Sequence, residues 1–121
     1  MNSKTTAVIG ASPNQDRYSY KAVEMLTSYH HEVIALGQKT GTIADVPINT
    51  DRPNINVDTV SLYLNPTNQE SWYSYILQLR PRRIIFNPGT ENPVLSSLAQ
   101  AHGIECTEAC TLVLLSTGQY D

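Results

Sequence analysis

The sequence predicts an α/β fold with a mostly parallel sheet, and three observations support this prediction. Short apolar runs recur along the chain, each bounded by polar or turn-forming residues. Segments in which apolar residues follow a helical spacing separate these runs. Several runs stop abruptly at glycine or Asn-Pro, as buried parallel strands do where they lead into a turn. With 121 residues, 40% of them hydrophobic, the chain is long enough for one domain with its own core.

The elements follow from these runs in chain order. Five strands are expected, over residues 7–10, 32–37, 57–64, 84–86 and 104–106. Helices are expected over residues 16–26, 68–79 and 91–101, with a short one within 108–115. Asp16 or Ser19 is expected to cap the first helix. Residues 38–53, rich in Gly, Thr, Pro and Asp, are expected to form a long connection with one short extended piece over 43–48.

The first strand ends in a turn of small residues, Gly10-Ala11-Ser12-Pro13-Asn14. Small residues let a ligand approach the backbone closely, and the free N–H groups of such a turn suit an anion such as a phosphate. Three further strands end in turn-forming residues, at 36–39, 64–66 and 87–90. Because ligands of doubly wound sheets bind at the carboxyl ends of the strands, the four loops are expected to line one crevice.

Composition and charge limit the classes of partner. The net charge is −3, from 8 basic and 11 acidic residues, and the chain has no basic run, which argues against nucleic acid. No apolar signal segment or membrane-spanning run is present, so a cytoplasmic protein without membrane association is expected. A charged content of 16% leaves room for a homo-oligomer contact. His102, Cys106 and Cys110 lack a fourth ligand, so no metal site is expected.

The loop after the second strand helps to separate nucleotide classes. The G-x-G-x-x-G pattern of dinucleotide sites is absent, because no further glycine closely follows Gly10. NAD sites place an acidic residue at the end of the second strand, whereas this chain has Leu36-Gly37-Gln38-Lys39 there. A lysine at this position favours a ligand with a ribose phosphate. NADP and coenzyme A (CoA) both carry one.

Residues 8–14 and 17–22 resemble the opening of the small stand-alone CoA-binding proteins of bacteria. Those proteins have a Rossmann-like fold similar to the N-terminal domain of the succinyl-CoA synthetase alpha subunit. Residues 57–66, 86–92 and 108–111 match later elements of the family, so the resemblance covers most of the chain. It implies one CoA-binding domain over residues 1–121, with three layers and a five-stranded, mostly parallel sheet.

The chain departs from the family in two loops. Gly37-Gln38-Lys39 keeps the basic residue of the family's second loop but lacks its usual Asn-Pro. Asn87-Pro88-Gly89 stands where many relatives carry a Gln and a Gly. The synthetase subunit also has a second domain with a phosphorylated histidine. This chain is not expected to contain that domain, so ligase activity is not implied.

The resemblance implies CoA or an acyl-CoA as the ligand, with its adenosine diphosphate over Gly10-Ala11-Ser12. Ser12 and backbone N–H groups would hold the pyrophosphate. Arg17 could add a charge-assisted contact, and Lys39 could meet the ribose phosphate. The residues expected at the ligand are Gly10, Ala11, Ser12, Pro13, Asn14, Arg17, Tyr18, Gly37, Lys39, Asn65, Pro66, Asn87, Pro88, Gly89 and Thr90.

Several of these side chains also have ordinary structural interpretations. Ser12 could cap a turn, and Arg17 and Lys39 could be solvated surface residues. Tyr18 and Tyr20 are expected to pack rather than to stack on an adenine. Glu91 suits a helix start better than general acid–base catalysis. Cys110 fits a small buried apolar residue better than a nucleophile.

No catalytic constellation is evident, so no catalytic residues are assigned. Three functions follow from the residues and the resemblance. The first is a CoA-binding module that carries or senses CoA or an acyl-CoA without catalysis. The second is an NADP-dependent or other nucleotide-dependent enzyme. The third is an interaction protein whose nucleotide pocket is vestigial.

Overall fold

The structure is a computed structural model that describes residues 5–121. A seven-stranded sheet with the order β3-β4-β2-β1-β5-β6-β7 forms its centre. All neighbouring strands are parallel except β3 and β4. The strands are β1 (Thr6–Ala11), β2 (Val33–Gly37), β3 (Thr42–Ile43), β4 (Val46–Asn49), β5 (Thr59–Leu62), β6 (Arg83–Phe86) and β7 (Glu105–Glu108). The helical segments are α1 (Tyr18–Ser28), α2 (Pro66–Gln69), η1 (Glu70–Trp72), α3 (Tyr73–Leu79), α4 (Pro93–Ala101) and α5 (Thr111–Ser116).

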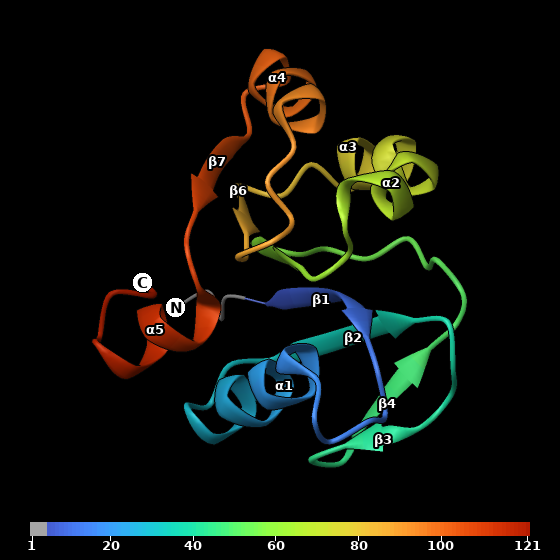
Figure 1. The fold of residues 1–121 in the computed structure, drawn as a ribbon, viewed down its shortest axis with the longest axis vertical. Helices are drawn as coiled ribbons and strands as arrows, with labels where there is room; N and C mark the ends of the chain where they lie inside the picture. The colour runs from blue at the N-terminus through green and yellow to red at the C-terminus, as the bar shows by residue number, and fades with distance from the viewer. Residues whose placement is uncertain (1–4) are drawn as a thin grey trace.

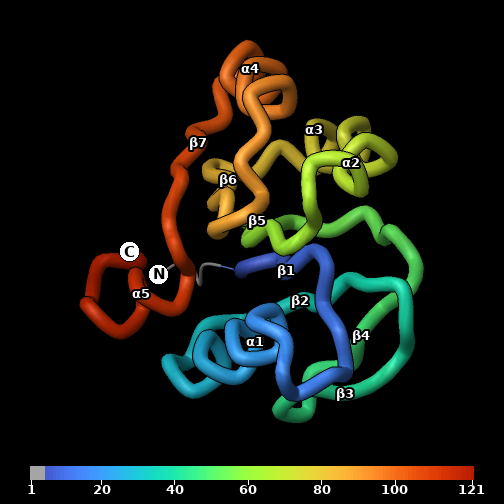
Figure 2. Tube along the Cα trace, in the orientation of Figure 1, coloured from blue at the N-terminus to red at the C-terminus, as the bar shows by residue number. Residues whose placement is uncertain are grey.

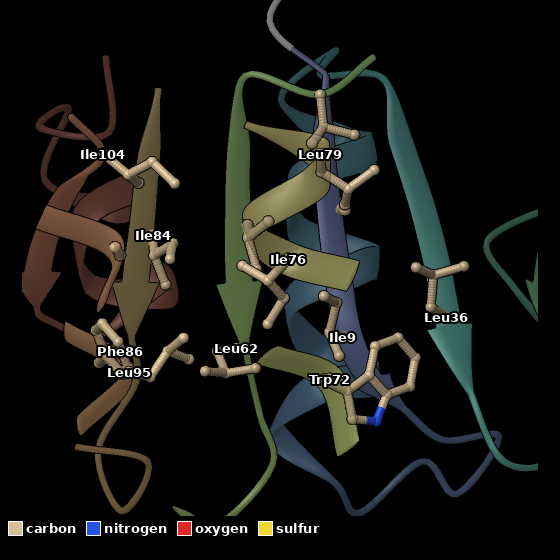
Figure 3. Close-up of a cluster of buried hydrophobic side chains, with 14 residues drawn as sticks. Ile9, Leu36, Leu62, Trp72, Ile76, Leu79, Ile84, Phe86, Leu95 and Ile104 are labelled. Atoms are coloured by element: carbon tan, nitrogen blue, oxygen red, sulfur yellow. The ribbon is translucent and has the colours of Figure 1, made fainter. Parts of the chain in front are cut away.

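Helices cover both faces of the sheet, which gives three layers (Figure 1). One face carries α1 and α5, and the other carries α2, η1, α3 and α4. Successive residues of β1 point to opposite faces, as in any strand. Ala7 and Ile9 therefore join the core under α3 and α4, while Val8 joins the core under α1 and α5. Figure 3 shows the first of these cores, where Trp72 and Ile76 lie over Ile9. The predicted α/β fold with a mostly parallel sheet is confirmed.

The expected number of strands is wrong, because the sheet has seven rather than five. The additional strands are β3 and β4, which form a hairpin within the 38–53 connection. Its two-residue turn has positive φ at both central residues, 49° at Ala44 and 67° at Asp45. Turns of this shape favour Asn-Gly. Because Ala44-Asp45 lacks that signature, the sequence indicated an extended piece without a hairpin.

Two helix predictions also differ from the structure. The helix expected over 68–79 is divided into α2, the 3₁₀ turn η1 and α3. The cap of α1 is Arg17, in extended conformation, and no side chain caps this helix. The expected capping by Asp16 or Ser19 is therefore wrong.

The order of the strands fixes where the loops gather. From β1 the chain passes through α1 to β2 on one side, whereas β5 lies on the other side of β1. Figure 2 shows the segments after β1 and β5 leaving toward opposite faces of the sheet. This is a topological switch point, where doubly wound proteins bind ligands. Because β2, β1, β5 and β6 are parallel neighbours, their four following loops lie along one edge.

Candidate ligand site at the carboxyl edge of the sheet

Gly10 lies against the segment that follows β5. Its φ is +95°, and a Cβ at this position would lie 3.0 Å from the carbonyl carbon of Tyr63. The Tyr63 N–H donates to the Ile9 carbonyl oxygen at 2.9 Å, which holds the two segments together. A side chain at Gly10 would be opposed by both the positive φ and the nearby backbone. Glycine is therefore strongly favoured at position 10, near the end of β1.

Gly37 at the end of β2 approaches the other side of the same turn. Its Cβ would lie 2.2 Å from the carbonyl oxygen of Ala11. Further along the second loop, a Cβ on Gly41 would lie 2.8 Å from Cβ of Pro13. The loops after β1 and β2 are thus in direct contact. Lys39 lies between these two glycines and is exposed.

The turn after β1 is a chain of local hydrogen bonds. The Asn14 N–H donates to Ser12 Oγ at 3.2 Å, and the Asp16 N–H donates to Asn14 Oδ1 at 2.9 Å. The Arg17 N–H donates to the Asn14 carbonyl oxygen at 3.1 Å. Ser12 thus has the turn-capping role, and its own hydroxyl hydrogen is still available to a ligand. The uncapped start of α1 follows directly and offers backbone N–H groups.

The two tyrosines near the start of α1 have different surroundings. Tyr18 is 67% exposed, and the Lys21 ammonium lies 5.3 Å from its ring centroid. The expected packing role is therefore wrong for Tyr18. Tyr20 is half-buried and packs against the core under α1 and α5, so packing is confirmed there.

The loop after β5 has a clear structural function. Asn65 is the cap of α2, where its Oδ1 accepts the Asn68 N–H at 2.9 Å. Pro66 occupies the first turn of this helix, where a missing N–H costs nothing. Both residues are exposed at the carboxyl edge.

The loop after β6 has a buried part and an exposed part. The Asn87 amide is buried and donates to Ser61 Oγ at 3.0 Å and to the Leu62 carbonyl oxygen at 2.9 Å. Its Oδ1 accepts the Thr111 N–H at 2.8 Å, which ties β6 to the start of α5. Thr90 is also buried, and its hydroxyl donates to the Asn87 carbonyl oxygen at 2.7 Å. These two side chains bond within the protein.

Pro88 and Gly89 form the exposed tip of this loop. The Gly89 N–H donates to a carboxylate oxygen of Glu91 at 2.9 Å. Asn92, rather than Glu91, caps α4 with its Oδ1. Glu91 therefore closes the loop instead of starting the helix.

Sequence analysis missed a buried polar network behind these loops, made by Gln69, Asn92 and Tyr73. Asn92 could have been found, because an Asn followed by Pro93 is a common helix start. Nothing in the sequence singles out Gln69, because its partners Thr90 and Asn92 lie 21 and 23 residues further along the chain. Its contacts depend on the tertiary structure.

The chemistry at this edge is that of a binding surface. Arg17 and Lys39 are exposed cations in the loops that follow β1 and β2.

Two partly buried acidic groups have raised pKa values. Burial, with a smaller contribution from nearby Cys110, raises the pKa of Tyr63 well above its ordinary value. Burial likewise raises the pKa of the Cys106 thiol. Among residues 5–121, no three His, Cys, Asp or Glu side chains are grouped to hold a metal ion.

Two hollows in the described surface lie elsewhere. One runs along the outer side of α4 and is apolar, and the other separates Arg52 and Asn54 from α3. Neither is lined by a residue expected at the ligand. Within the described residues, no helix is both long and apolar enough to cross a membrane.

These features define a doubly wound, Rossmann-like α/β protein whose strand-end loops meet at a switch point. The chain belongs to the CoA binding domain family, whose model matches residues 4–116. The family predicted from the resemblance is thereby confirmed. No curated protein matches the chain.

Solved structures agree with this fold. A crystal structure titled as an uncharacterized protein is 49% identical, with a TM-score of 0.94 over 98% of this chain and 99% of that one. A Thermus thermophilus protein titled cell-free ID.343 is 18% identical, with a TM-score of 0.85 over 97% and 90% of the two chains. A hypothetical protein from Pyrococcus horikoshii OT3 is also 18% identical, with a TM-score of 0.85 over 94% and 82%. The last two show a shared fold only.

Proposed function

We propose that residues 1–121 act as one domain that binds coenzyme A or an acyl-CoA without catalysing a reaction on it. The observation that carries this proposal is the close packing of three strand-end loops around Gly10 and Gly37. A Cβ at Gly37 would collide with backbone, and one at Gly10 would be opposed by its positive φ and a tight contact with Tyr63, so exposed main chain lies there next to an uncapped helix start. Such a surface suits the pyrophosphate of a nucleotide-type ligand. Membership of the CoA binding domain family supports CoA as that ligand.

Each expected residue has a role in this proposal. The pyrophosphate would lie on Gly10-Ala11-Ser12, where the Ser12 hydroxyl and the backbone N–H groups at the uncapped start of α1 would donate to it. Pro13 and Asn14 would shape the turn, and Arg17 and Tyr18 would flank it from the start of α1. Lys39, next to Gly37 in the second loop, would meet the ribose phosphate.

The two loops on the other side of β1 would flank the adenine or the pantetheine arm. Asn65 and Pro66 are exposed and could contact it directly. In the loop after β6, Pro88 and Gly89 are the exposed residues, whereas the side chains of Asn87 and Thr90 bond inward. We therefore propose that Asn87 and Thr90 contribute by shaping the loop.

Binding without catalysis fits the donor set at this edge. The described residues there supply backbone N–H groups, hydroxyls and two exposed cations, but no hydrogen-bonded nucleophile and base. A cation in the second loop also suits NADP, so NADP remains the competing ligand. The two proposals differ in the ligand that binds.

Isothermal titration calorimetry with CoA, dephospho-CoA and NADPH tests the proposal. CoA should bind, and dephospho-CoA should bind more weakly because it lacks the phosphate that Lys39 would meet. Equal affinity for CoA and dephospho-CoA would contradict the proposed contact of Lys39 with the ribose phosphate. Binding of NADPH but not of CoA would support an NADP-dependent enzyme instead. Binding of none of these nucleotides would refute the proposed ligand.

A further inference from the structure

One buried side chain bridges the two loops that follow β5 and β6. Gln69 on α2 is fully buried. Its Nε2 donates to the carbonyl oxygen of Leu64, in the loop after β5, at 2.8 Å. The same nitrogen donates to the carbonyl oxygen of Thr90, in the loop after β6, at 2.8 Å. The amide group thus spans two strand-end loops that are 26 residues apart (64 to 90) in sequence.

The other end of the Gln69 amide is fixed as well. Its Oε1 accepts a hydrogen bond from Asn92 Nδ2 at 2.9 Å. Asn92 Nδ2 also donates to the Tyr73 hydroxyl at 2.8 Å, while its Oδ1 caps α4 by accepting two backbone N–H groups. Both amides are therefore bonded at their nitrogen and their oxygen. Buried polar networks of this completeness rigidify the structure around them.

The bridge is specific to glutamine. Asparagine has the same amide but is one methylene shorter, so it could not keep both contacts without movement of the backbone. Glutamate has the same shape, but as a carboxylate it has no N–H to donate. An apolar residue of similar length would leave the carbonyl oxygens of Leu64 and Thr90, the second of them buried, without this donor.

We propose that Gln69 is a positioning residue of the ligand site. It sets the separation of the Asn65-Pro66 turn from the Pro88-Gly89 turn, and so preorganises both for the ligand without contacting it. A preorganised site binds more tightly because less conformational entropy is lost on binding. The inference rests on the proposed function for the identity of its ligand. The effect of Gln69 on the two loops can be tested without any ligand.

The test uses Gln69→Met, which removes the amide, and Gln69→Glu, which keeps the shape and the acceptor for Asn92. Backbone hydrogen–deuterium exchange and CoA calorimetry are measured on both variants. Leu115→Ala is the control for general destabilisation, because Leu115 belongs to the core under α1 and α5, on the face of the sheet opposite to Gln69. Exchange should accelerate together in segments 63–66 and 88–92 of the Gln69 variants, and not preferentially there in the control. CoA affinity should fall by about tenfold in the Gln69 variants, a typical size for a positioning effect.

The outcomes separate the inference from the proposed function. Faster exchange in both loops with weaker CoA binding supports the inference. Unchanged exchange in segment 88–92, or wild-type CoA affinity in both variants, overturns it. If the wild-type chain binds no CoA, the proposed function fails, while the exchange data still decide whether Gln69 positions the loops. If neither variant folds, Gln69 serves the fold rather than the site, and the inference is wrong.

Discussion

Gly37 and Ala11 come so close that a Cβ on Gly37 would lie 2.2 Å from the Ala11 carbonyl oxygen. This contact joins the end of β2 to the end of β1 at the point where β1 has an irregular register between Ile9 and Ala11. The contacting atom is backbone, and Ala11 is itself paired with Gly37 at the end of β1, so it cannot swing away as a flexible side chain could. The two loops proposed to hold phosphates therefore meet at Gly37, where any side chain would clash with the backbone of Ala11.

The first prediction is that Gly37→Ala strongly destabilises the protein. Because backbone would have to move, the free energy of unfolding should fall by about 2–3 kcal/mol, in the upper range for overpacked sites. Urea unfolding measures this change. Gly118→Ala is the matched control, since it has open space around its Cβ and a φ of +73°. The control should lose only about 1 kcal/mol from its positive φ, so equal losses would contradict the steric argument.

The second prediction concerns Lys39 and the ribose phosphate. Lys39→Ala should weaken CoA binding by about fivefold, the size expected for one exposed charge contact. Dephospho-CoA binding should stay unchanged, because that ligand lacks the phosphate. Arg82→Ala removes the same charge just before β6, at the opposite edge, where Arg82 is paired with Asp58 at 2.9 Å. The idea fails if both variants weaken CoA binding equally or if dephospho-CoA responds like CoA.

The third prediction uses the hairpin turn between β3 and β4. Replacing Ala44-Asp45 with Asn-Gly should raise the free energy of unfolding by about 0.5–1 kcal/mol, because both positions have positive φ. Thermal unfolding of Ala44→Asn/Asp45→Gly measures the gain as a higher Tm. Ala44→Val, which puts a β-branched residue at φ 49°, should lower the Tm instead. A lower Tm for the Asn-Gly variant would contradict the turn geometry.

The same hairpin shows what sequence patterns can predict. The strands β1, β2, β5 and β6 were predictable because buried parallel strands are continuous apolar runs that end at turn residues. The edge strand β7 is not buried, and the sequence indicated it only as the short segment 104–106. The strands β3 and β4 have two and four residues, and the sequence indicated them only as one extended piece over 43–48, because their turn lacks the usual hairpin signature. The gathering of four loops at one edge was predictable from the parallel order alone. The inward bonding of Asn87 was not, because its partners Ser61 and Thr111 are distant in sequence.

The last prediction is a loss of stability at alkaline pH. Burial raises the pKa of Tyr63 and of Tyr120 above the ordinary value of 10.0. Above about pH 10 the unfolded chain loses these protons while the folded chain keeps them, so the free energy of unfolding falls as pH rises. Each buried tyrosine contributes up to about 1.4 kcal/mol per pH unit.

Urea unfolding between about pH 8 and pH 11 should therefore show that the free energy of unfolding falls as the pH rises. Tyr63→Phe should reduce the slope, and Tyr29→Phe, at an exposed tyrosine, is the control. A slope in Tyr63→Phe as steep as in the wild type would show that the Tyr63 hydroxyl does not drive the loss.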